Sequence, residues 1–122
     1  MRGFIIDPFT QQIATVQVAS GLEGIYQQVN ARPVTTAELP CEHTLWLDDE
    51  GLYRENQHFW HWRGASQPFA GIGLVLGFNP MTGDSEDADA QLRDVIEDSV
   101  KWIGDRHTLR TIMALGVYKE AS

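Results

Sequence analysis

The hydrophobic positions of this chain recur at two different periods, and each change of period marks an expected element. Residues 3–7 form an apolar run that ends at a proline, and residues 13–19 alternate between two faces and are rich in β-branched side chains. We expect these two segments to form a β-hairpin. In residues 20–33 the apolar positions recur at helical spacing instead, which predicts a short helix that Ser20 caps and that ends near Asn30.

Further strands are expected in the middle of the chain. The segments 34–40, 43–52 and 57–64 read as strands, and the third returns from a polar turn that closes the second. The apolar run GIGLVLGF, residues 71–78, predicts a buried central strand. Its two leading glycines mark a bulge or a close backbone approach, because the GxG pattern lacks the rest of a phosphate-binding loop.

The last third of the chain predicts a longer helix. The loop before it is rich in turn-forming residues, and Ser85 or Asp87 is placed to cap the helix. The helical stripe that follows comprises Leu92, Val95, Ile96, Ser99, Val100 and Ile103. Residues 105–122 have an apolar centre, TIMALGVY, which fits a last strand, an extension of the helix or an oligomer contact.

These elements predict a single α+β domain over residues 1–122. We expect a mainly antiparallel sheet of about five strands, one short helix after the second strand and one longer amphipathic helix near the C-terminus. The length of 122 residues and the hydrophobic fraction of 43% are those of one ordinary globular domain.

Composition also indicates a compartment. The apolar runs are too short to span a bilayer, and the N-terminus lacks the apolar stretch and cleavage site of a signal peptide. The single cysteine, Cys41, cannot form an internal disulfide. We therefore expect a cytoplasmic protein without membrane contact.

Charge selects among partners. Seventeen acidic and nine basic residues give a formal net charge of −8, which disfavours direct binding to nucleic acid and to anionic membranes. Within residues 84–98 there are seven acids and one basic residue, Arg93. Helix capping and solubility are the ordinary explanation of such a block, and a face for a basic partner is the functional one. The seven acids are Asp84, Glu86, Asp87, Asp89, Asp94, Glu97 and Asp98.

The segment HFWHWRG, residues 58–64, concentrates aromatic and basic side chains. Strand geometry puts Trp60 and Trp62 on one face with His58, and the other three side chains on the opposite face. The tryptophan face is expected to be core, because each indole buries a large apolar area. The opposite face supplies a ring and a guanidinium that suit a planar or anionic ligand. The candidates for this alternative ligand site are Phe59, Trp60, His61 and Arg63.

Metal binding and catalysis find weaker support. Cys41, His43, His58 and His61 are of the types that bind zinc, but a regular strand points the last two to opposite faces. The chain contains no HExxH, CxxC or nucleophile-elbow motif, and Glu42 disfavours a thiolate at its neighbour Cys41. We expect no cofactor and no enzymatic activity.

Three motifs, RGFIIDP, LWLDDEGL and QPFAGIGLVLG, resemble the pattern of a family of small proteins of unknown function carried by phages, plasmids and other bacterial mobile elements. The likeness covers residues 2–80 and rests on turns and strands. It implies an α+β fold and a mobile-element setting in a bacterial host, with no activity and no site residues.

In that setting several functions are open. The first is inhibition of a host defence complex, such as a CRISPR effector, by carboxylates at 84–98 that occupy its basic nucleic-acid-binding surface. The second is a sink for signalling nucleotides, with the 58–64 segment as its pocket and the tail as a homo-oligomer contact. An accessory protein of the element without a defence role is the third.

Overall fold

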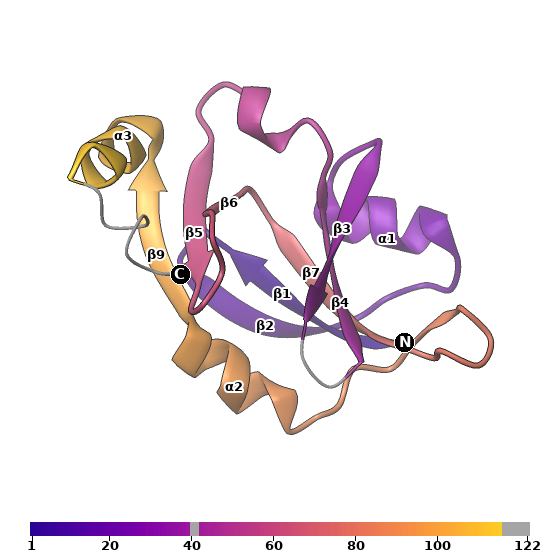
Figure 1. Cartoon of the computed structure of the whole chain (residues 1–122). Coiled ribbons are helices and arrows are strands. Elements are labelled where there is room, and N and C mark those ends of the chain that lie inside the picture. The colour runs from indigo at the N-terminus through magenta and orange to yellow at the C-terminus, as the bar shows by residue number, and fades with distance from the viewer. Residues whose placement is uncertain (40–41, 116–122) are drawn as a thin grey trace.

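The computed structural model describes residues 1–39 and 42–115, which form two antiparallel sheets and three helices (Figure 1). The larger sheet contains the predicted hairpin and the predicted central strand. Its strands follow the order β2 (Gln12–Gln17), β1 (Arg2–Asp7), β7 (Gly73–Phe78), β4 (His43–Asp48) and β3 (Val34–Leu39), and β8 (Ser85–Glu86) pairs with the end of β7. The α+β class and the mainly antiparallel pairing are confirmed.

The central position of β7 explains its continuous apolar sequence. Both faces of this strand are covered, and Leu74, Val75 and Leu76 have no exposed surface. A Cβ at Gly73 would lie 2.9 Å from both the Leu45 side chain and the Trp60 ring. The predicted close approach at this glycine is therefore confirmed.

The smaller sheet corrects two of the expectations. Its order is β6 (Phe69–Ala70), β5 (His58–Trp62) and β9 (Val100–Asp105). The expected return of β5 onto β4 is wrong, because the 3-10 turn η1 (Gly51–Tyr53) separates them and β5 pairs with β6 and β9. The expected long helix is also wrong. Helix α2 (Leu92–Ser99) stops where Val100 begins a strand, since pairing with β5 outweighs the helical spacing of Val100 and Ile103.

Helix α3 (Arg106–Ala114) follows β9, so the alternative of a continued helix is wrong as well, and the alternative of a last strand is wrong for the part of TIMALGVY up to Ala114. Its N-cap is Asp105, whose Oδ1 accepts hydrogen bonds from the Thr108 N–H at 2.9 Å and from the Thr108 hydroxyl at 3.0 Å. These bonds lower the pKa of Asp105 below its ordinary value. The part of the tail from residue 116 lies outside the described residues, and an oligomer contact there stays a prediction.

The other two helices are short and begin without the expected caps. Helix α1 (Leu22–Val29) begins after Gly21 and not after a Ser20 cap, and it ends as predicted at Asn30, which has a φ of 59°. Ser85 belongs to β8, and α2 begins after Gln91, so neither Ser85 nor Asp87 caps it.

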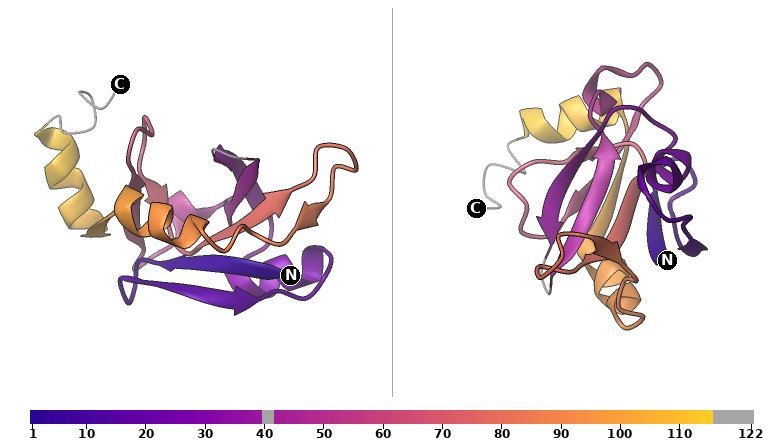
Figure 2. Two further views of the ribbon diagram at one scale, coloured as in Figure 1. Left: turned by 90° about the horizontal axis from the view of Figure 1, so that it is seen from below. Right: turned by 90° about the vertical axis from the view of Figure 1, so that its right-hand side faces the viewer.

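The two sheets and the helices build the core in layers. One face of the larger sheet packs against Trp60, Trp62 and α2, and α1 covers part of the opposite face through Ile25 and Val29 (Figure 2). Helix α3 covers the outer face of the smaller sheet. In the described part of the chain, no helix has the length and apolar character needed to cross a bilayer.

Candidate functional site

The aromatic segment of β5 is buried on both faces. Trp60 and Trp62 belong to the main core, as predicted, and the Trp60 indole N–H donates to the Gly71 carbonyl at 2.9 Å. The face of the alternative ligand site is not open at Phe59, which has no exposed surface and packs under Leu109 of α3. Neither Phe59 nor Trp60 offers a ring on which a ligand can stack in this structure.

The two remaining members of that candidate site stay together but lack a ring. His61 is buried and its Nε2–H donates to the Ala65 carbonyl at 2.8 Å, whereas Arg63 is exposed. Both line a small hollow of about 350 Å³ with Asp98 and Lys101. The hollow therefore has mixed charges. Among the described residues no phenylalanine, tyrosine or tryptophan lines it, so it has no ring on which a planar ligand can stack.

The residues of the zinc alternative lie in different sheets. His43 is on β4, and its Nε2 accepts a hydrogen bond of 3.0 Å from the Asp89 N–H. His58 and His61 are on β5, where the His58 ring lies 5.0 Å from the Phe9 ring. Cys41 lies outside the described residues. Within the described ranges, no group of three or more His, Cys, Asp or Glu side chains is placed to hold a metal ion.

The acidic block forms one side of the molecule. Residues 84–98 run from the β7–β8 hairpin to the end of α2, along the side that faces the viewer in Figure 2, left. All seven acids of this block are exposed. We call these seven residues, named above, the acidic side.

Local hydrogen bonds account for part of the acidic side. The Asp87 Oδ1 accepts from the Arg2 N–H at 2.6 Å, and the Asp89 Oδ1 accepts from the Gln91 N–H at 2.9 Å. Glu97 pairs with Arg93 at 3.2 Å, and the Arg93 guanidinium also donates to the Ile13 carbonyl and the Thr15 hydroxyl on β2. No hydrogen bond or ion pair within the described part of the chain engages the other four carboxylates, which belong to Asp84, Glu86, Asp94 and Asp98.

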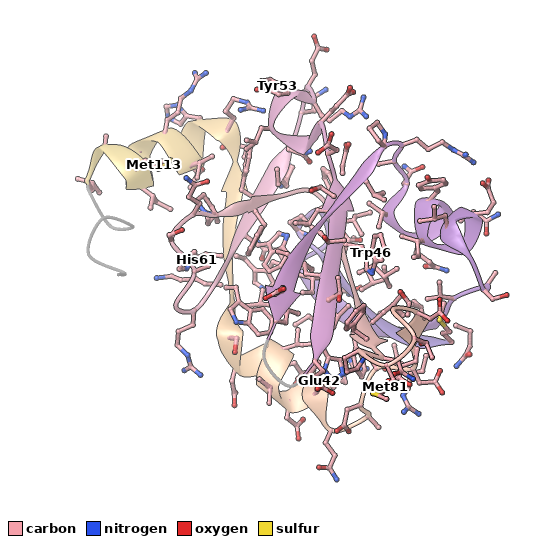
Figure 3. The ribbon with its side chains drawn as sticks, turned by 45° about the vertical axis from the view of Figure 1, so that its right-hand side comes forward. Glu42, Trp46, Tyr53, His61, Met81 and Met113 are labelled. Atoms are coloured by element: carbon pink, nitrogen blue, oxygen red, sulfur yellow. The ribbon has the colours of Figure 1, made fainter. Side chains whose placement is uncertain are left out.

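A groove that the sequence did not predict lies on the same face of the larger sheet as α1, over the part of that face that α1 leaves uncovered. Its volume is about 960 Å³. The floor is formed by β3 and β4, where Trp46 faces Thr36 and Thr44 faces Glu38 across the pair. The first turn of α1 and the β7–β8 hairpin form the walls. Figure 3 shows Trp46 near α1, and Glu42 and Met81 near the hairpin.

The groove combines apolar side chains with negative charge. Leu22 and Phe78 line it and are 52% and 38% exposed. Three carboxylates line it, those of Glu38, Glu42 and Asp84, and no lysine or arginine is found among its described lining residues. The N-terminal amine of Met1 also lies there and donates to the Val18 carbonyl at 2.7 Å.

The strand pattern contained a signal for this groove. In HTLWLD the buried positions His43, Leu45 and Leu47 alternate with Thr44 and Trp46, so a tryptophan stands on the polar face of β4. The Trp46 indole N–H is closed off from solvent and is the one buried side-chain donor without a hydrogen-bond partner in the described residues. Trp46 packs at the margin of the core between α1 and β7 and also lines the groove, so a tryptophan at a position that alternates with the main-core residues of β4 is the signal that could have been followed.

Comparison with known proteins supports the resemblance at the level of the family. Residues 1–100 match the model of a family described as a domain of unknown function (DUF3846). The matched range contains the groove and the acidic side, and β9 and α3 lie almost entirely beyond it. No curated protein and no solved structure matches the chain.

Proposed function

Since the chain belongs to the DUF3846 family, a domain of unknown function, we propose a function from its own surfaces. The protein is a non-enzymatic protein that binds a basic surface of a partner protein. The acidic side supplies the contact. The partner in this proposal is a host protein with a nucleic-acid-binding surface, such as a CRISPR effector or another defence complex. The chain then acts in the cytoplasm of a bacterium as a phage- or plasmid-encoded inhibitor.

The observation that carries the proposal is the exposure of all seven carboxylates along one side of the molecule. Arg93 is the one basic residue in this stretch, and its guanidinium is held by Glu97 and by β2. Three further cations lie close to the acidic side: the Arg2 guanidinium donates to the Ala88 carbonyl at 2.9 Å, and Arg63 and Lys101 share a hollow with Asp98. They compensate part of the negative field, but within the described residues none of the three forms an ion pair with the acidic side. Such a surface attracts the lysines and arginines that otherwise bind phosphates, and it raises the rate of association at low ionic strength.

Two features favour this function over a nucleotide sink. Phe59 and Trp60 have no exposed surface, so the stacking pocket expected in the 58–64 segment is closed. The groove is open, but its three carboxylates repel the phosphates of a nucleotide.

The test replaces four acids by their amides: Asp84→Asn, Glu86→Gln, Asp87→Asn and Asp89→Asn. Amides keep the side-chain oxygens that accept from the Arg2 and Gln91 N–H groups, so folding should be unaffected. A control with the same change of net charge lies elsewhere on the surface: Glu23→Gln, Asp49→Asn, Glu50→Gln and Glu55→Gln.

Each form is immobilised and exposed to extract from the bacterial host at about 50 mM and about 200 mM salt. We expect the wild type and the control to retain a nucleic-acid-binding protein at low salt, and short duplex DNA to displace it. The acidic-side variant should retain none. Equal retention by this variant and the control would reject the acidic side as the contact.

A further inference from the structure

The groove beside the acidic side has the chemistry of a peptide site. We infer that it binds an extended basic segment of the partner protein, with an apolar side chain of that segment inserted between Leu22 and Trp46. The inference rests on the proposed function in naming the partner, because Asp84 belongs both to the groove and to the acidic side.

The apolar part of the groove argues for an inserted side chain. Leu22 and Phe78 are 52% and 38% exposed at its walls, and Met81 on the adjoining hairpin is 91% exposed. Exposed apolar residues that gather around a concavity mark interaction sites more often than isolated ones do. The volume of about 960 Å³ accommodates several side chains and lies in the range of ligand sites.

The charges argue for a basic occupant. Three carboxylates and one amine, that of Met1, line the groove, so its charged groups carry a net negative charge. Glu38 is exposed on the floor, and Glu42 and Asp84 are exposed near the hairpin. Lysine or arginine side chains would find complementary partners there, and an acidic segment would be repelled.

The free edge of β3 argues for an extended conformation. The Pro33 carbonyl accepts from the Asp49 N–H at 3.0 Å and continues the pairing of β3 with β4 by one position. Because hydrogen-bonded positions alternate in an antiparallel pair, the backbone N–H and C=O groups of Thr36 and Glu38 point away from β4. No other described strand pairs with β3. An added strand would satisfy these groups and would place alternate side chains on the groove face.

The Trp46 indole is consistent with such an occupant. Buried polar groups in native proteins almost always have a hydrogen-bond partner, and the Trp46 N–H has none among the described residues. The Trp46 ring also lines the groove, so a peptide seated there would lie against it.

The probe for a test is the capped peptide Ac-Lys-Thr-Leu-Thr-Lys-Thr-NH2, which as a strand presents Lys, Leu and Lys on one face. Two control peptides replace the lysines by glutamate or the leucine by serine. Each is titrated into ¹⁵N-labelled protein, and amide and indole N–H shifts are recorded. We expect saturable shifts at Thr36, Glu38 and Trp46 with the first peptide and with neither control.

The groove variants are Leu22→Gln and the pair Glu38→Gln with Glu42→Gln. Their matched controls are Leu52→Gln, at a leucine that is 55% exposed outside the groove, and Glu50→Gln with Glu55→Gln. Each groove variant should raise the dissociation constant of the peptide about tenfold, and each control should leave it within about twofold of the wild-type value. These side chains are exposed, so folding is expected to be retained.

The possible failures separate the two proposals. No saturable shift, or shifts confined to residues 86–98, would overturn the groove while leaving the acidic side intact as the contact. Equal binding of lysine amide alone would identify a small cation site and also overturn the peptide. Conversely, the peptide assay and the capture assay can disagree. If the peptide binds the groove but the acidic-side variant still captures the host partner, the proposed function is rejected and the groove site stands.

Discussion

The indole N–H groups of Trp46 and Trp60 are both cut off from solvent, and they differ in whether a hydrogen-bond acceptor faces them. The Trp60 N–H donates to the Gly71 carbonyl at 2.9 Å, whereas the Trp46 N–H has no partner in the described residues. Replacement by phenylalanine removes the N–H from either ring and keeps an aromatic side chain. The pair Trp60→Phe and Trp46→Phe therefore compares a satisfied buried donor with an unsatisfied one.

The two variants are expected to lose different amounts of the free energy of unfolding. Trp60→Phe removes the donor and leaves the Gly71 carbonyl unpaired, which costs about 1–3 kcal/mol. With the space left by the smaller ring, we expect a loss of about 2–4 kcal/mol in the free energy of unfolding. Trp46→Phe removes an unpaired donor, which offsets the lost contact area. We expect its free energy of unfolding to stay within about 1 kcal/mol of the wild type.

Urea unfolding followed by far-ultraviolet circular dichroism measures both variants without relying on tryptophan fluorescence. The slopes of the transitions should be equal, so that the midpoints report stability. An equal loss in the two variants, or a larger loss for Trp46→Phe, would refute the assignment of the bonded and unbonded donors.

Three further predictions test the local structure. Gly24→Ala should lower the melting temperature despite the better helix propensity of alanine, because the added Cβ would overlap the Ala19 carbonyl oxygen. Leu109→Ala should lower the free energy of unfolding in urea by about 2–5 kcal/mol, since it uncovers Phe59 beneath α3. Asp105→Ala should lower the melting temperature at neutral pH. A lowered folded-state pKa gives stability that is present above the unfolded value of 3.8 and lost as pH falls through the folded value, so the difference from the wild type should shrink in that acidic window.

Local patterns predicted those parts of the fold that neighbours in the sequence determine. The hairpin of β1 and β2 and the end of α1 at Asn30 follow from alternation and from a residue that tolerates positive φ. The end of α2 could not be predicted in this way. Val100 and Ile103 fit the helical stripe and also fit a strand, and only the presence of β5 as a pairing partner decides between them.

The candidate sites show the same division. Period-two geometry correctly separated Phe59 from Trp60, but it could not show that α3, from nearly fifty residues later in the chain, covers Phe59. The exposure of the acidic side was predictable from its composition alone. The position of Trp46 was a local signal, but the groove itself was not predictable from the sequence, because it depends on how much of a sheet face a helix leaves bare.

That bare face follows from the length of α1. A helix of eight residues is about 12 Å long, and four spacings of about 4.8 Å make the five main strands of the larger sheet about 19 Å wide. Ile25 and Val29 of α1 pack with Leu74 and Leu76 of β7, toward the centre of the sheet. Val34 of β3 and Trp46 of β4 pack at the margin of this cluster. Helices α2 and α3 lie against other surfaces, so among the described elements none covers Thr36 and Glu38 of β3, which are exposed. A polar strand edge with a tryptophan beside it is therefore left open where the acidic side begins, and an added strand from another protein is the kind of partner that would complete this sheet.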